Sequence, residues 1–397
     1  MENNPAPAPD QPMPLDRGEG RSRRTPARRI ALVLTGLGAV ALVVVVVLVW
    51  WRGAAEPFTH APLTLGPRQP GYLVTREELQ RRAALAADGV EPYAEAVHEL
   101  LEFADRARSR KPGPQEPLEI TGTESPFLDD AVRAYALALA YGLTGERAYA
   151  EAGADYLRAW STTTRTTVGT CPDSGACQTS LIMSRAAPAY VFAADLISDS
   201  GTLSEADETA FRAWLRDVIL PTAPRLANNW GDAGVFTRFV LTDYLGDRDG
   251  TLSALDSWLT QLDRIDADGH LPEETRRGSA GMSYTQEALQ YRVAVAAIAE
   301  RYGLDLWRMR GAAGATLVDA IDYLASYWFR PRDWPWVPDV STPSTGPFWE
   351  IAYARLGDPA FEPIIADRRP FSDQGHSALR WTTLTDGVPF GSANPTP

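Results

Sequence analysis

The sequence predicts an all-α protein, built from successive antiparallel helical hairpins and preceded by one transmembrane helix. Three observations predict this class. Apolar residues recur at spacings of three and four through most of the chain after residue 74, strand-like patterns are scarce, and residues 30–50 carry no charge. With 397 residues, of which 45% are hydrophobic, the chain is long enough to bury a large core.

The N-terminal region is predicted to anchor the protein in the cell membrane. Residues 1–29, rich in Pro and Arg, are expected to form a disordered cytoplasmic tail, and residues 30–51 a transmembrane helix that serves as signal anchor. Six arginines precede the apolar run, so the N-terminus is expected in the cytoplasm and the C-terminal part outside it. A cleaved signal peptide is the alternative, although its apolar core is usually shorter.

The exported part is predicted to be one helical domain. Residues 52–73 contain four prolines without helical periodicity and are expected to be a linker, followed by the domain over residues 74–397. Thr75 and Ser204 stand where helices should begin, and Gly145 and Gly246 where helices should end. Strand signals are confined to the region after residue 335, including residues 379–384. The apolar spacing predicts helices over 75–88, 92–107, 127–144, 147–160, 183–199, 204–218, 233–245, 251–265, 284–303 and 312–329.

Charge and cysteine content narrow the function. A formal charge of −13 argues against a nucleic-acid partner, which requires basic patches, and would repel a polyanion at long range. Cys171 and Cys177 are the only cysteines, and in an exported domain they are expected to form a disulfide that closes a loop. A metal site would need more ligands nearby, so we predict no metal and no cofactor. Two long irregular stretches, 107–126 and 160–182, are candidates for the walls of a site.

The most informative segment runs from residue 227 to residue 307. It contains Asn-Asn-Trp-Gly at 228–231, Asp-Gly-His-Leu-Pro-Glu-Glu at 268–274, an arginine pair seven residues before Tyr284, and Gly-Leu-Asp-Leu at 303–306. Polysaccharide β-elimination needs such residue types. Amide and guanidinium groups neutralise a uronate carboxylate, so that the neighbouring C5 proton can leave, and a phenolic oxygen can carry that proton.

The spacing between Arg277 and Tyr284 allows two geometries. In one continuous helix, seven residues would place both side chains on one face, roughly 10 Å apart. Gly278 and Gly281 favour the second geometry, in which Arg277 lies on a loop and Tyr284 at the start of the helix 284–303. The spacing alone occurs by chance in many proteins, and only its combination with the other motifs is informative.

In this order and at these separations, the motifs resemble those of the alginate lyase family, whose pattern is N-N-H, D-G-x-L-P-x-E, R-x6-Y and G-V-D-L. The resemblance extends over about residues 120–310 and implies an incomplete (α/α) toroid acting on an acidic polysaccharide. It implies catalytic roles for Asn229 and Arg277, which would neutralise the uronate carboxylate, and for Tyr284, which would serve as base and acid. Candidates for substrate binding are Asn228, Trp230, Arg276 and His270.

One departure from the family pattern keeps alternatives open. Trp230 stands where the family has histidine, and an indole cannot accept a proton. Either Tyr284 acts alone while Trp230 stacks on the sugar, or His270 supplies an imidazole, or the protein binds glycans without cleaving them. A glycoside hydrolase on an (α/α) barrel is a further alternative, because Glu273 and Glu274 lie close to Asp266 and Asp268.

Overall fold

A computed structural model describes residues 58–174, 177–373, 375 and 377–392. The predicted cytoplasmic tail (1–29) and transmembrane helix (30–51) lie outside the described residues. Among the residues that are described, no helix is both long and apolar enough to cross a membrane. The contacts of the folded unit begin at Thr59, and part of the predicted linker packs on it, with Leu65, Tyr72 and Leu73 buried.

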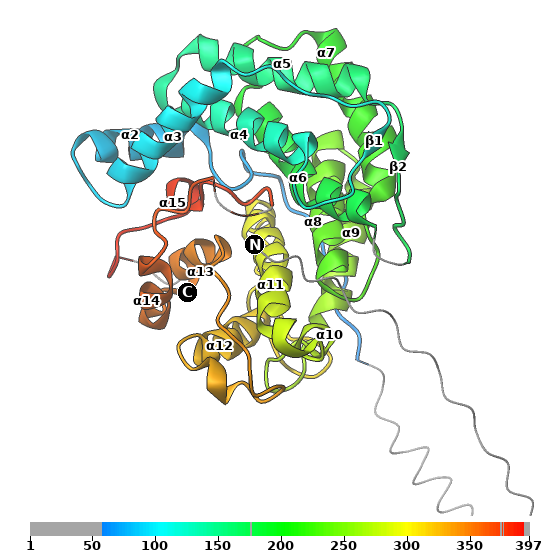
Figure 1. The fold of residues 1–397 in the computed structure, drawn as a ribbon, viewed down its shortest axis with the longest axis vertical. Helices are drawn as coiled ribbons and strands as arrows, with labels where there is room; N and C mark the ends of the chain where they lie inside the picture. The colour runs from blue at the N-terminus through cyan, green and yellow to red at the C-terminus, as the bar shows by residue number, and fades with distance from the viewer. Residues whose placement is uncertain (1–57, 175–176, 374, 376, 393–397) are drawn as a thin grey trace, which may run out of the picture. The chain divides into compact units, whose positions relative to one another are not determined.

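The folded unit is all-α and toroid-like, as predicted (Figure 1). Each of the ten helical segments expected from apolar spacing overlaps a helix. The helices are α2 (Arg76–Ala87), α3 (Tyr93–Arg108), α4 (Pro126–Thr144), α5 (Arg147–Thr163), α6 (Gln178–Leu196), α7 (Glu205–Trp214), α8 (Asn229–Leu245), α9 (Arg248–Leu262), α10 (Pro272–Thr275), α11 (Gly281–Ala299), α12 (Leu317–Tyr327), α13 (Phe348–Leu356), α14 (Glu362–Ala366) and α15 (Thr382–Thr385).

Local sequence signals set the helix ends. Thr75 and Ser204 each form a capping box, in which the cap hydroxyl accepts a backbone N–H three residues on and the acidic residue there accepts the cap's own N–H. Gly145 and Gly246 end α4 and α8 with φ of 72° and 73°, a left-handed conformation that glycine adopts without steric cost.

Four helices form the centre of the core. Contacts run from α4 to α6, from α6 to α8 and from α8 to α11, and these helices are buried on nearly all sides. Outer helices pack against them, α5 on α4 and α9 on α8, so that inner and outer helices alternate along the chain. Each outer helix returns the chain to the end at which the inner helices begin, so α8 and α11 begin near one another. The C-terminal helix α15 contacts α2 and α3.

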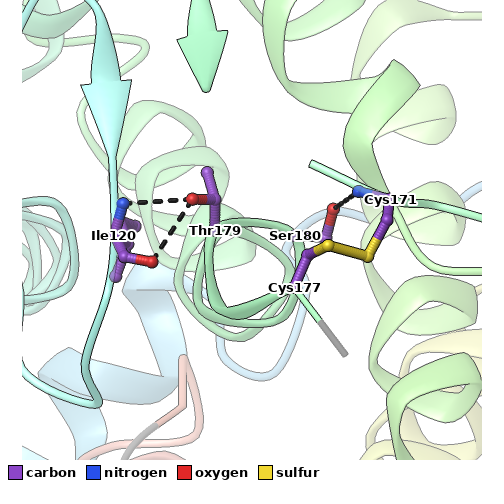
Figure 2. Close-up of a disulfide and its surroundings, with 5 residues drawn as sticks. All are labelled: Ile120, Cys171, Cys177, Thr179 and Ser180. Atoms are coloured by element: carbon purple, nitrogen blue, oxygen red, sulfur yellow. Dashed lines mark hydrogen bonds between the residues drawn. A yellow bond between two sulfur atoms is a disulfide. The ribbon is translucent and has the colours of Figure 1, made fainter. Parts of the chain in front are cut away.

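The two long irregular stretches are tied to each other. Strand β1 (Leu118–Glu119) pairs in parallel with β2 (Thr167–Val168), which are the strands of the described part of the chain. Figure 2 shows the predicted disulfide between Cys171 and Cys177. Beside it, the Thr179 hydroxyl accepts a hydrogen bond from the Ile120 amide at 3.0 Å, so α6 also begins against the first stretch.

The strand signal near residues 379–384 was misleading. Trp381 has φ of 63°, which no extended strand can accommodate, and residues 382–385 form α15 instead. Two threonines of this stretch are buried and hydrogen-bonded. Thr382 donates to the Pro347 carbonyl at 3.0 Å, and Thr383 donates to the Glu350 carboxylate at 2.5 Å.

Candidate active site

Asn229, Arg277 and Tyr284 lie together, although 48 residues separate the first two. The Arg277 Nη1 donates a hydrogen bond to the Asn229 Oδ1 at 3.0 Å. The Arg277 guanidinium lies over the Tyr284 ring, 3.4 Å from its centroid. Asn229 is fully buried, whereas Arg277 and Tyr284 are half-buried. An amide, a guanidinium and a phenol, the three groups predicted for β-elimination, therefore lie in contact.

Asn229 is held at the first turn of α8 by its neighbours. The Asn228 side chain caps the helix by accepting the Trp230 backbone N–H at 3.1 Å. Gly231 allows the preceding loop to pass closely, because a Cβ at this position would lie 1.7 Å from the Leu226 carbonyl oxygen. The Asn-Asn-Trp-Gly motif thus encodes a cap and a close backbone approach as well as a polar side chain.

Arg277 and Tyr284 adopt the loop geometry that the glycines favoured. Arg277 precedes a 3-10 turn at Gly278–Ala280, and Tyr284 lies in the first turn of α11. Gly278 has φ of 64°, and the bend at this residue prevents one continuous helix from Arg277 to Tyr284. The bend lets the guanidinium fold back over the phenol ring, whereas a straight helix would keep the two groups two turns apart.

Glu274 joins the two halves of the site. One carboxylate oxygen accepts the Asn229 backbone N–H at 2.5 Å, and the other lies 3.4 Å from the Arg277 Nη1. Only 1% of Glu274 is exposed. Burial, and secondarily the charge of Asp232, raises the pKa of Glu274 to about 7, although the Asn229 N–H and nearby arginines oppose this shift. Sequence reasoning named Glu274 only among the carboxylates of a possible glycoside hydrolase.

A buried ion pair lies behind these residues. Arg292 of α11 donates to both carboxylate oxygens of Asp232 of α8, at 2.9 and 3.2 Å. Its third contact is the Gln261 carbonyl at 3.0 Å, and the Gln261 side chain donates to the Leu226 carbonyl at 2.8 Å. Desolvation raises the pKa of Asp232, and Arg292 opposes the shift. This network fixes α8 to α11 and holds the loop that precedes Asn229.

The other predicted site residues lie outside this contact. Arg276 is exposed and paired with Glu273. The His270 Nδ1 lies 2.5 Å from Asp268, and its ring packs 4.5 Å from the Trp336 ring. Within the described part of the chain, no hydrogen bond, ion pair or ring contact joins His270 to Asn229, Arg277 or Tyr284.

Trp230 follows Asn229 and is half-buried against the core. Each carboxylate considered for a glycoside hydrolase contacts another side chain or a backbone N–H. Glu273 pairs with Arg276, and Glu274 accepts the Asn229 backbone N–H. Asp268 lies 2.5 Å from the His270 Nδ1, and Asp266 lies 3.8 Å from the His270 Nε2.

A cavity of about 330 Å³ adjoins the helix that carries Tyr284. One side of the cavity is a polar stripe of α11, at positions that recur with helical spacing: Ser283, Gln286, Glu287 and Gln290. Arg185 of α6 also lines the cavity and forms an ion pair with Glu287. Sequence reasoning missed Arg185 and Glu287. The sequence shows the stripe as polar residues on an otherwise apolar helix. It does not show that Arg185, about 100 residues away, lies opposite Glu287.

Comparisons with known proteins identify the family and the fold. The Alginate lyase family model matches residues 86–334. An alginate lyase from Bacteroides ovatus superposes with a TM-score of 0.65 at 18% identity, covering 80% of this chain and 99% of that one. Alginate lyase A1-III from Sphingomonas species A1 gives 0.64 at 16% identity, covering 81% and 98%. A Tyr-to-Phe variant of A1-III, complexed with tetrasaccharide, gives 0.59 at 15%, covering 82% and 98%. No protein of curated function matches in sequence. The family match spans more than half of the chain, which therefore belongs to the alginate lyase family.

Proposed function

We propose that this protein is a polysaccharide lyase that cleaves a uronate-containing, alginate-like glycan by β-elimination. The observation that carries the proposal is the contact of Asn229, Arg277 and Tyr284 at the adjoining ends of α8 and α11. The family match supports the reaction class. The tetrasaccharide complex of the A1-III variant supports an oligosaccharide as the ligand.

Each residue has a distinct chemical role in this proposal. Arg277 and Asn229 bind the uronate carboxylate, so that it can accept negative charge as the C5 proton leaves. The deprotonated Tyr284 oxygen accepts that proton. The released electron pair forms the C4–C5 double bond, the C4–O bond breaks, and the proton passes from Tyr284 to the departing oxygen. In the described structure the Tyr284 hydroxyl makes no hydrogen bond. It is therefore available to contact the substrate, as the proposed role requires.

Trp230 favours a second candidate, a glycan-binding protein without turnover. An indole can stack on a sugar ring but cannot exchange a proton, so the site lacks the imidazole of the family pattern. The two candidates differ in their product. A lyase releases an unsaturated uronate that absorbs near-ultraviolet light, whereas a binding protein leaves the glycan intact.

The deciding experiment compares wild-type protein with Tyr284→Phe on alginate. We expect wild type to produce ultraviolet absorbance, and Tyr284→Phe to lose roughly 10²–10⁴-fold in kcat, the usual contribution of acid–base groups. Oligosaccharide affinity measured by calorimetry should change little. Tyr327→Phe, a half-buried tyrosine of α12, is the matched control and should retain full activity. Equal activity of Tyr284→Phe and wild type would remove Tyr284 from the mechanism.

We also propose that residues 30–51 anchor the protein in the cell membrane, with the folded domain outside the cytoplasm. The uncharged run and the arginines before it support the anchor. The Cys171–Cys177 disulfide supports an oxidising compartment for the domain. Full-length protein should then sediment with membranes and be cleaved by protease added to spheroplasts. A variant lacking residues 1–57 should be soluble, and sedimentation of that variant would argue against this anchor.

A further inference from the structure

We propose that Glu274 is a positioning residue that sets both the geometry and the net charge of the carboxylate-binding pair, so that substrate binds more tightly when Glu274 is protonated. The inference rests on the proposed function, because it concerns how Asn229 and Arg277 receive a uronate. It goes further by giving the site a built-in dependence on protonation.

The geometry shows that Glu274 holds both residues at once. Its two oxygens face the Asn229 backbone N–H at 2.5 Å and the Arg277 Nη1 at 3.4 Å. The same Arg277 nitrogen donates to the Asn229 side chain at 3.0 Å. Glu274 sits on the short helix α10, between the segments that carry the two residues, and only 1% of it is exposed. A single buried carboxyl therefore fixes the separation between amide and guanidinium.

The charges around Glu274 come from three segments. Asp232 of α8 and Arg292 of α11 neutralise one another as a buried bidentate pair. Arg277, at the end of Glu274's own segment, is the remaining charge that faces the carboxyl. When Glu274 is ionised, its negative charge balances the positive charge of Arg277, and Glu274 and Arg277 together are neutral. When Glu274 is protonated, Glu274 and Arg277 together carry one positive charge, which an incoming uronate can neutralise.

Protonation near neutral pH makes this change relevant to substrate binding. The pKa of Glu274 is raised to about 7, mainly by burial. Below this pH the Glu274 carboxyl is protonated and does not neutralise Arg277, so the guanidinium can pair with the substrate carboxylate. Above it, the ionised carboxyl competes for the same guanidinium. We therefore expect KM to rise with pH through about 7, by at least about fivefold, the lower end of ordinary coupling between two binding events.

The test uses Glu274→Gln, with Glu273→Gln as matched control. Glu273 is the neighbouring residue on α10, and its carboxylate faces Arg276 instead of Arg277. Wild type and Glu273→Gln should show KM rising through about pH 7, whereas Glu274→Gln should show a KM that does not change there. The pH dependence of kcat, which follows the chemical step, should remain in all three. Persistence of the KM inflection in Glu274→Gln, or its absence from wild type, would overturn the proposal.

Calorimetry in the Tyr284→Phe background separates this proposal from the proposed function. An alginate tetrasaccharide should bind more weakly above pH 7 and should take up about one proton, measured in buffers of different ionisation enthalpy. Adding Glu274→Gln should remove both effects. Binding without pH dependence would refute the role of Glu274 alone, while absence of binding at any pH would refute both proposals. Should Glu274→Gln fail to fold, Glu274→Asp decides. Its shortened carboxyl should raise KM at every pH, and a KM profile identical to that of wild type would overturn the proposal.

Discussion

The Arg277 guanidinium stacks on the Tyr284 ring, with its central carbon 3.4 Å from the ring centroid. The same guanidinium reaches the Asn229 amide through Nη1. A flat, delocalised cation can lie on an aromatic face and donate hydrogen bonds from its edge at the same time. Arg277 thus holds the Asn229 amide and the Tyr284 phenol close to each other, and in the proposed reaction these two groups bind the carboxylate and transfer the proton.

Arg277→Lys should lower kcat/KM by roughly 10²–10³-fold, the cost of losing one well-placed donor at a developing charge. Lysine keeps the positive charge but has neither the planar face for Tyr284 nor the forked donors for Asn229 and substrate. Arg276→Lys is the control, because Arg276 is exposed and pairs with Glu273. Initial rates of ultraviolet absorbance measure both variants. Equal effects of the two substitutions would contradict the assignment of Arg277.

Gly231→Ala should destabilise the protein and displace Asn229. The new methyl group would lie 1.7 Å from the Leu226 carbonyl oxygen, so the loop or the helix must move. We expect a loss of at least about 1–3 kcal/mol in the free energy of unfolding, together with reduced activity. Gly122→Ala meets no atom within 4 Å and should be neutral. Urea unfolding followed by circular dichroism compares the two. A Gly231→Ala protein as stable as Gly122→Ala would be inconsistent with the close approach.

Replacing Cys171 and Cys177 by serine should lower the free energy of unfolding without lowering kcat. The disulfide closes a loop with a sequence separation of six, for which the chain-entropy estimate is about 2 kcal/mol. Cys177 immediately precedes α6, which carries Arg185 at a later turn, so the site should remain in place. Guanidinium unfolding of the double variant measures the first effect, and kcat at low temperature the second. A large fall in kcat in fully folded protein would assign the loop a role in the site.

His270→Ala should leave kcat within about twofold of wild type while lowering thermal stability. The His270 ring packs 4.5 Å from Trp336 and 6.0 Å from Tyr323, and aromatic pairs contribute about 0.5–1.5 kcal/mol each. Its Nδ1 is occupied by Asp268. Calorimetric melting and initial rates measured on one preparation separate the two effects. A hundredfold fall in kcat would instead establish His270 as the imidazole that replaces the family histidine.

Much of the fold follows from short-range signals in the sequence. The spacing of apolar residues located the helices, and Thr75, Ser204, Gly145 and Gly246 marked their ends, because caps and stops act within one turn. The order of motifs predicted Asn229, Arg277 and Tyr284 as site residues, and the structure brings these three side chains into contact. The strand signal at 379–384 failed because intrinsic strand preferences depend strongly on context, and here the left-handed Trp381 and buried hydrogen bonds outweigh them.

The sequence by itself determined the helical class, the positions of the helices and the residue types of the site. The tertiary structure decided which side chains meet. It turned Arg277 inward and left Arg276 exposed, set Glu274 between amide and guanidinium, and brought Arg185 opposite Glu287. The physical reason is that periodicity and capping are properties of neighbours in the chain, whereas burial, and the proton affinity that burial gives Glu274, depend on helices packed from distant segments.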